Sequence, residues 1–220
     1  MQVRRGDVEG RQALEDFCRS YWPAIYTCLR ALGCQREEAL DETQTFLSQF
    51  IHGGGLEQVA PERGRLRSYL RQCLRNHLAT VRRDAARQKR GGGQIHISME
   101  DVETFDVPSQ PESADQWFDR RWAWSVVRGA MDRMAARYTA RGKLALFAEL
   151  KPGLISPDLL KPYAEIATLT GMTEGQVKLE VHRARRRLAD ELRAEVAATL
   201  PPEEDVEDEL RYLLSVLSHE

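Results

Sequence analysis

The residues with the clearest chemical purpose lie in the segment 163–182, and the chemistry they offer is hydrogen bonding to bases and phosphates. Ala167, Gly171 and Val177 stand at offsets of 0, 4 and 10, which is the spacing of a helix-turn-helix. The small alanine lets two helices approach, the glycine suits a left-handed turn, and the valine packs the second helix onto the first. We therefore predict a DNA-binding motif in this segment.

The second helix of such a motif enters the major groove, so its exposed residues are the candidate contacts. Thr173 is a good cap for the start of this helix, and Gln176, three residues later, completes a capping box. We predict that Gln176 and Lys178 reach base edges and that the arginines after them hold phosphates. The predicted duplex contacts are Thr173, Gln176, Lys178, His182, Arg183, Arg185 and Arg186. The alternative is a solvated helix whose arginines pair with acidic residues nearby.

A second concentration of positive charge covers residues 65–90, where nine basic residues stand against one acid, Asp84. An apolar stripe at helical spacing predicts a helix, and its basic face suits phosphates. Asn76 and the edges of Tyr69 and His77 offer stacking or base-edge contacts, as in single-strand binders, although Tyr69 by itself fits the core better. The arginines on the polar face are Arg67, Arg71, Arg75, Arg82, Arg83 and Arg87. A solubilising face is the alternative.

Helical patterns account for all of the elements that must position these residues, and no segment alternates like a strand. We expect helices over 10–20, from Pro23 to Leu32, over 37–51 and 65–81, and from Trp117 onward, with a proline-rich loop over 151–162. The predicted fold class is all-α, with two small helical modules joined by a flexible acidic linker. The predicted parts are a helical bundle over 1–93, the linker over 94–116, the helix-turn-helix module over 117–200 and an acidic extension over 201–220.

Composition narrows the class of protein further. The chain has 220 residues and a net charge of −2, yet it carries −7 over 99–119 and −6 over 201–220. It has no apolar run long enough to span a membrane and no signal peptide. Its four cysteines have no zinc spacing, and we expect them to be reduced and buried. We therefore expect a cytoplasmic protein with no cofactor and no metal, and the lack of any phosphate-loop or catalytic motif predicts that it is not an enzyme.

Together these segments resemble a bacterial RNA polymerase sigma factor of the sigma-70 family, extracytoplasmic-function (ECF) type. Members of that type join a region-2 helical bundle to a region-4 helix-turn-helix. The resemblance implies that the segment 163–188 reads the minus-35 promoter element as a duplex and that 65–93 melts and reads the minus-10 element. The minus-10 contacts that it implies are Tyr69, Arg75, Asn76, Arg82, Arg83 and Arg87.

The segment 37–50 is similar to the region-2 helix that grips the polymerase clamp. Its polar face is acidic, so we expect it to avoid DNA and to dock on a basic protein surface. The polymerase contacts that the resemblance implies are Asp41, Glu42, Gln44, Phe46 and Leu47. The implied partners are core RNA polymerase, promoter DNA and, by resemblance only, a cognate anti-sigma factor, and the free protein would be a monomer. A dimeric helix-turn-helix repressor or activator and an acidic adaptor are the alternatives.

Two stretches depart from the family pattern. Residues 129–162 are longer and richer in proline than the usual approach to region 4. The chain also continues beyond Pro201-Pro202, with six acids in seven residues and then four leucines at helical spacing, Leu210, Leu213, Leu214 and Leu217. We hypothesise that this extension packs on the helix-turn-helix module with its acids near the arginines there. A helix that only completes the core is the alternative.

Overall fold

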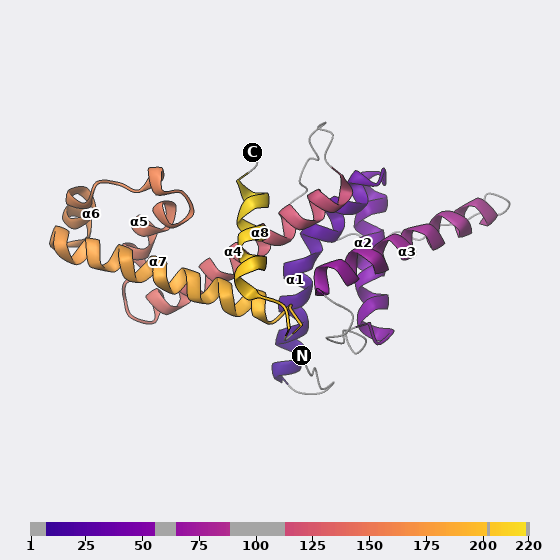
Figure 1. Cartoon of the computed structure of the whole chain (residues 1–220), viewed down its shortest axis with the longest axis horizontal. Coiled ribbons are helices and arrows are strands. Elements are labelled where there is room, and N and C mark those ends of the chain that lie inside the picture. The colour runs from indigo at the N-terminus through magenta and orange to yellow at the C-terminus, as the bar shows by residue number, and fades with distance from the viewer. Residues whose placement is uncertain (1–7, 56–64, 89–112, 202, 219–220) are drawn as a thin grey trace.

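The computed structural model describes residues 8–55, 65–88, 113–201 and 203–218 (Figure 1). In these ranges every regular element is a helix, which confirms the all-α fold class. The elements are α1 (Val8–Ala31), α2 (Arg36–His52), α3 (Leu66–Gln88), α4 (Ala114–Thr139), α5 (Leu144–Ile155), the 3-10 helix η2 (Pro157–Leu159), α6 (Tyr163–Thr170), α7 (Glu174–Ala197) and α8 (Val206–Leu217). None of these described helices has both the length and the apolar character that crossing a membrane requires.

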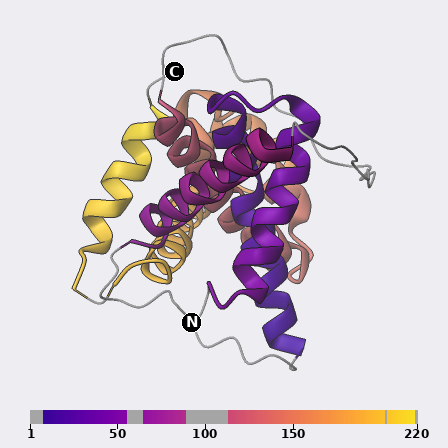
Figure 2. The ribbon, with the colours of Figure 1, turned by 90° about the vertical axis from the view of Figure 1, so that its right-hand side faces the viewer.

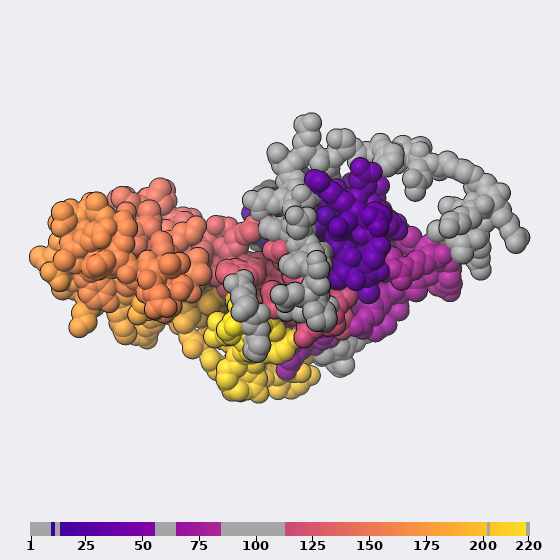
Figure 3. All heavy atoms as spheres, turned by 90° about the horizontal axis from the view of Figure 1, so that it is seen from above, coloured from indigo at the N-terminus to yellow at the C-terminus, as the bar shows by residue number. Residues whose placement is uncertain are grey.

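The molecule is elongated, and its two ends hold different helices. α1, α2 and α3 lie at one end, while α5, α6 and the start of α7 lie at the other (Figure 1). The long helices α4 and α7 extend between the ends, and α8 lies beside them near the middle (Figures 1 and 3). In Figure 2, where the right-hand end of Figure 1 faces the viewer, α3 lies across the bundle and α8 lies at its edge. The basic helix and the helix-turn-helix are therefore far apart.

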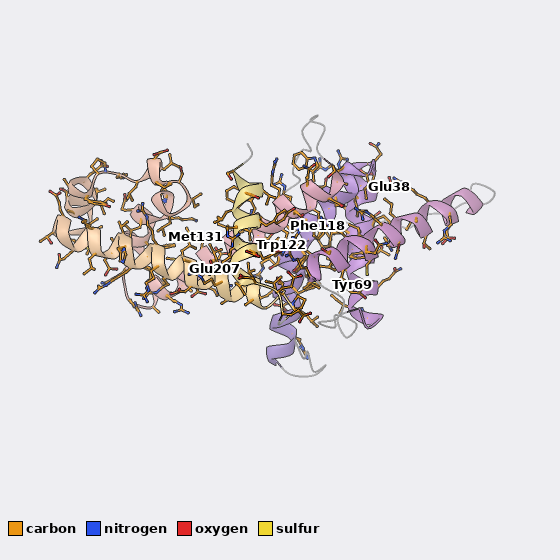
Figure 4. All side chains as sticks on the ribbon, in the orientation of Figure 1. Glu38, Tyr69, Phe118, Trp122, Met131 and Glu207 are labelled. Atoms are coloured by element: carbon orange, nitrogen blue, oxygen red, sulfur yellow. The ribbon has the colours of Figure 1, made fainter. Side chains whose placement is uncertain are left out.

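The first core cluster fills the end that contains α1. It draws side chains from α1, α2, α3, the first half of α4, the end of α7 and α8. Its fully or nearly fully buried members include Ile25, Leu29, Phe46, Leu70, Leu74, Phe118, Trp122 and Leu213. Figure 4 shows Phe118 and Trp122 of α4 in the middle of the molecule. Helices from both ends of the sequence thus share one hydrophobic core.

The second core cluster supports the helix-turn-helix. It is built from the second half of α4 together with α5, α6 and the first part of α7, and includes Met131, Met134, Phe147, Leu150, Ile166, Val177 and Val181. Val127 of α4 and Leu192 of α7 pack against both clusters. The two cores therefore meet inside the same two helices, and the change from one to the other falls within α4 near Val127. The domain boundaries drawn from the sequence stay a prediction.

Pro23 and Pro152 lie within helices, although the sequence pattern predicted that helices end or begin at these positions. The prediction of separate helices before and after Pro23 is wrong, because α1 continues through it. The predicted loop over 151–162 is also wrong in its first part, because α5 includes Pro152 and ends at Ile155. Proline removes one helical hydrogen bond, but residues close to Pro23 are deeply buried. Tyr21, Ala24 and Ile25 are each less than 5% exposed, and their packing holds α1 together.

α4 starts earlier than the sequence pattern indicated. Ser113 accepts a hydrogen bond at Oγ from the Gln116 backbone N–H (3.2 Å), and the Ser113 N–H donates to Gln116 Oε1 (2.7 Å). This capping box places the first residue of α4 at Ala114, inside the predicted linker. The part of the linker up to residue 112 lies outside the described residues.

Candidate nucleic-acid interface

The helix-turn-helix forms as the spacing predicts. α6 ends at Thr170, and Gly171 follows with φ of 68°, in the left-handed region, while its N–H bonds the carbonyl of Ala167. Ala167 is 8% exposed and Val177 is 0% exposed, so the small residue and the plug meet in the second core cluster. Val181, Ala184 and Leu188 continue the buried face of α7. The three sequence positions that define the motif are confirmed in their structural roles.

The predicted capping box of α7 is also present. Thr173 Oγ1 accepts from the Gln176 N–H at 3.3 Å, and the Thr173 N–H donates to Gln176 Oε1 at 2.9 Å. The side-chain oxygen of Gln176 is therefore occupied by the cap. What remains for a base edge is the Gln176 side-chain NH₂ group. The exposed side chain of Lys178, one position beyond the buried Val177, takes no part in the cap.

The predicted phosphate contacts lie on the solvent side of α7. His182, Arg183, Arg185 and Arg186 are all exposed. Arg183 Nη1 bonds Glu180 Oε1 at 3.1 Å, which partly supports the alternative of internal ion pairs. Within the described residues, however, no carboxylate pairs with Lys178, Arg185 or Arg186. These three cations can therefore meet an anionic ligand without first breaking an ion pair in that part of the chain.

An open hollow beside α7 adds arginines that the sequence did not single out. Arg137 of α4 lines this hollow together with Arg183, Arg186 and Arg187 of α7, and the other lining residues are Asp190, Glu191 and Ala194. Glu191 accepts from Arg133 at 2.8 Å and from Arg137 at 2.9 Å. Arg137 comes well before the motif in the sequence, so only the packing of α4 on α7 places it here.

These features define residues 163–188 as a helix-turn-helix, with a capped second helix and exposed cations on its outer face. Residues 161–188, which contain α6, the turn and the first part of α7, match the family described as Sigma-70, region 4. That family is a non-enzymatic DNA-binding domain of transcription initiation. Searches of curated proteins and of solved structures found no match for this chain.

The C-terminal half of α3 presents its predicted contacts to solvent. Asn76, Arg82 and Arg83 are exposed. Arg82 Nη2 donates to the carbonyl of Leu32 at 2.6 Å, and Arg83 Nη2 donates to Thr80 Oγ1 at 3.0 Å. Neither arginine pairs with a carboxylate in the described part of the chain. The side chain of Arg87 lies outside the described residues.

The N-terminal half of α3 differs from the sequence expectation of a free basic face. Arg67 is only 5% exposed, and its Nη1 bonds Asp119 Oδ2 at 2.9 Å. Arg71 Nη1 bonds the same oxygen at 3.0 Å, and Arg75 pairs with Asp115. Carboxylates of α4 thus neutralise arginines that are distant in sequence. Counting charges along 65–90 therefore overstates the positive charge open to a ligand.

The aromatic candidates of α3 face α2. Tyr69 is half-buried, with its ring centroid 5.9 Å from that of Phe50 in α2. His77 Nε2 lies 2.7 Å from Glu42 Oε2, and its ring makes an edge contact with Phe46. Both rings therefore have internal packing roles, which agrees with the core assignment for Tyr69.

The predicted polymerase contacts on α2 divide into two groups. Asp41 and Gln44 are exposed, and Glu42 is half-buried beside His77. Phe46 and Leu47, at 3% and 4% exposure, belong to the first core cluster. The structure does not bring these two side chains to the surface. A partner that meets this face of α2 touches its acidic and amide groups.

The acidic extension takes only part of the position that we hypothesised. Leu210 and Leu213 are buried in the first core cluster rather than under the recognition helix. Glu204 and Glu209 pair with Arg65 and Arg67 of α3, while Glu207 Oε1 accepts from Arg193 Nε of α7 at 2.6 Å. α8 packs against α4 and the C-terminal part of α7, where Arg193 lies about 10 Å along the helix beyond Arg186. The extension therefore packs on helices of the predicted module over 117–200 and pairs with one of its arginines, but within the described residues its acids pair with none of the predicted duplex contacts.

Proposed function

We propose that this chain is a bacterial sigma factor that binds core RNA polymerase and directs it to promoters. The observation that carries the proposal is the capped helix-turn-helix within residues 161–188, in the segment that matches Sigma-70, region 4. Its recognition helix exposes Lys178, Arg185 and Arg186, which no carboxylate of the described ranges neutralises. A sigma factor makes and breaks no bond, so its whole chemistry is recognition. We place it in the cytoplasm and in the extracytoplasmic-function type, as a monomer when free.

In this proposal the recognition helix α7 reads the minus-35 duplex. The contacts are Thr173, Gln176, Lys178, His182, Arg183, Arg185 and Arg186. Base-edge bonds come from the first turns of the helix, where Gln176 and Lys178 lie, and the arginines bond phosphates. Thr173 contributes by holding the cap, because its hydroxyl is already bonded to the Gln176 N–H.

The minus-10 element meets α3 in the same proposal. Asn76, Arg82 and Arg83 form its most accessible part, because all three are exposed and the two arginines pair with no carboxylate in the described ranges. Tyr69, Arg75 and Arg87 complete the proposed set. Single-stranded DNA binds where a positive groove follows the backbone and bases find hydrogen-bonding or stacking partners.

Core polymerase docks on α2 in this proposal, through Asp41, Glu42 and Gln44. Phe46 and Leu47 support that helix from the core, because both are buried. The acidic and amide character of the exposed face suits a basic protein surface rather than DNA. A cognate anti-sigma factor is a further proposed partner.

The test is transcription in vitro with bacterial core polymerase on a pool of random promoters. We expect start sites that depend on the chain, with two shared upstream elements in the aligned templates. The double variant Lys178→Ala/Arg185→Ala should lose the upstream element of the pair. Arg19→Ala is the control, because that exposed arginine pairs with Asp16 of its own helix, α1, at the other end of the molecule from α6. Duplex binding without any chain-dependent initiation would instead indicate a repressor or activator.

A salt titration of duplex binding separates phosphate contacts from base contacts. The logarithm of the affinity falls with the logarithm of salt concentration by about 0.9 for each phosphate contact. Arg185→Ala and Arg186→Ala should each reduce that slope by about one contact and weaken binding to all sequences alike. An unchanged slope in both variants would remove these arginines from the proposed interface.

A further inference from the structure

The turn before α8 and the start of α3 are joined by ion pairs and a backbone bond. Arg65 Nη2 bonds Glu204 Oε2 at 2.7 Å, and Arg65 Nη1 bonds Glu209 Oε2 at the same distance. The Leu66 N–H donates to the carbonyl of Thr199 at 3.2 Å. The C-terminal segment therefore lies directly over the first turn of the basic helix.

Behind these contacts is a buried polar centre. Arg67, Asp119 and Glu209 are exposed by 5%, 1% and 1%. Arg67 Nε and Nη2 bond the two oxygens of Glu209 at 2.5 and 3.1 Å, and the Tyr212 hydroxyl donates to Asp119 Oδ2 at 2.6 Å. The Arg67 guanidinium also lies 4.3 Å from the centre of the Tyr212 ring. α8 thus supplies a carboxylate and an aromatic face to one arginine of α3.

We propose that α8 and the turn before it, residues 203–217, form an autoinhibitory cover on α3. Glu204 and Glu209 occupy Arg65 as phosphates would, and Glu209 shares Arg67 with Asp119 of α4, so Arg65 meets DNA only when the cover leaves. This inference rests on the proposed minus-10 role of α3. The cover makes the affinity of α3 for DNA depend on whether the C-terminal helix is docked or released.

The cover is suited to reversible release. α8 has 12 residues, and an isolated helix of that length is marginal in water. Its ion pair with α3 is open to solvent, since the side chains of Arg65 and Glu204 are 30% and 33% exposed. A phosphate that replaces a carboxylate on Arg65 preserves the charge-assisted hydrogen bond. Exchange of one anion for another therefore leaves Arg65 neutralised.

The test compares two neighbouring substitutions in the full chain. Glu204→Gln removes a carboxylate from Arg65, whereas Glu203→Gln removes the same charge from an exposed residue that pairs with no cation in the described part of the chain. We measure binding of a single-stranded oligonucleotide against salt. One additional phosphate bound raises the slope by about 0.7 and tightens binding roughly fourfold at 0.15 M salt relative to 1 M. Glu204→Gln should give part of this value, because Glu209 still pairs with Arg65, and Glu203→Gln should bind like the wild type.

Glu209→Gln should give a larger effect, because Glu209 touches both arginines. Circular dichroism checks that this variant is folded, and Glu204→Gln carries the test if it is not. Hydrogen exchange of residues 206–217 supplies a second readout. Oligonucleotide binding should speed exchange there, because the cover leaves. Unchanged exchange, or equal affinity for Glu203→Gln and Glu204→Gln, would overturn the cover.

A separate double variant tells failure of the cover from failure of the proposed function. Arg82→Ala/Arg83→Ala removes two exposed cations of α3 that lie away from the cover. Weaker oligonucleotide binding in that variant supports the minus-10 role, whatever the cover does. Unweakened binding contradicts the minus-10 role and the cover with it.

Discussion

Among single residues, Asp119 shows how one buried carboxylate organises three helices. Its Oδ2 accepts from Arg67 of α3 at 2.9 Å, from Arg71 of α3 at 3.0 Å and from Tyr212 of α8 at 2.6 Å. Burial by itself lowers the pKa of Arg67, but the hydrogen bond to Glu209 and the charge of Asp119 together raise that pKa by more, so it stays above its ordinary value. Arg67 is therefore charged throughout the accessible pH range.

We expect Asp119→Asn to be strongly destabilising. It leaves buried cations with one fewer counter-charge, and breaking a buried pair in this way costs about 3–5 kcal/mol. Urea denaturation measures the free energy of unfolding. The control is Asp208→Asn, which breaks an exposed pair with Arg211 and should cost less than about 1 kcal/mol. Similar losses of unfolding free energy in the two variants would show that the buried ion pairs of Asp119 stabilise the fold no more than an exposed pair does.

The buried thiols make stability depend on alkaline pH. Burial, helped by the charge of Asp115, raises the pKa of Cys28 to about 12, and burial with the charge of Glu38 raises that of Cys34 to about 11. In the unfolded chain these thiols ionise from about pH 9, so above that pH the unfolded state binds fewer protons. The contribution of these thiols to the free energy of unfolding should therefore be complete below pH 9 and fall as pH rises toward the folded values.

Cys28→Ala tests this dependence. Removing one such thiol should flatten the fall in unfolding free energy between about pH 9 and 10 by up to about 1 kcal/mol, since one pKa unit corresponds to about 1.4 kcal/mol. Urea titrations at several pH values in that interval supply the slopes for both proteins. Identical slopes would mean that Cys28 titrates alike in the folded and unfolded chains.

Among the elements, the turn between α6 and α7 depends on a single backbone conformation. Gly171 has φ of 68° and no atom within 4 Å of where a Cβ would lie. We expect Gly171→Ala to cost about 1–2 kcal/mol, purely because an L-residue resists the left-handed region. Gly175→Ala is the matched control, since Gly175 is helical and also has open space around it. It should be neutral or slightly stabilising, because alanine favours helices.

Thermal or urea unfolding of these two glycine variants measures the difference. Loss of stability in Gly171→Ala alone would confirm that the turn conformation carries the cost. Equal effects in both variants would contradict it. Because the turn aims α7, Gly171→Ala should also weaken duplex binding more than its effect on stability explains.

In the molecule as a whole, α4 and α7 belong to both core clusters, so the two ends should unfold together. All four tryptophans lie on α1 or on the first half of α4, at the end far from the helix-turn-helix. Leu150→Ala removes a fully buried side chain from the second core cluster and should cost about 2–5 kcal/mol. Tryptophan fluorescence and circular dichroism should report the same lowered midpoint.

Two separate transitions, or a fluorescence midpoint that Leu150→Ala leaves unchanged, would show that the ends unfold independently. The flexible two-module arrangement expected from the sequence would then describe the molecule better than a continuous core. Coincident transitions would instead support a unit in which recognition helix and bundle move together.

The local features of this protein follow from short-range sequence patterns. Helical periodicity predicted an all-α chain, and the offsets between Ala167, Gly171 and Val177 predicted the turn and the plug of the motif. Thr173 and Gln176 predicted the cap. Each of these depends on residues within about ten positions of one another, where backbone geometry alone decides which side chains meet.

Which charges face solvent, in contrast, depends on how distant helices pack. Nothing near Arg67 in the sequence indicates that Asp119 and Glu209 neutralise it, because they come from helices that begin 48 and 140 positions after the start of α3. The same reason explains why Phe46 and Leu47 are buried, why α1 tolerates Pro23, and why α8 packs on α4 and α7 with its Glu209 on Arg67 of α3. Long-range packing sets burial, and burial decides whether a charged side chain faces a ligand or another part of its own chain.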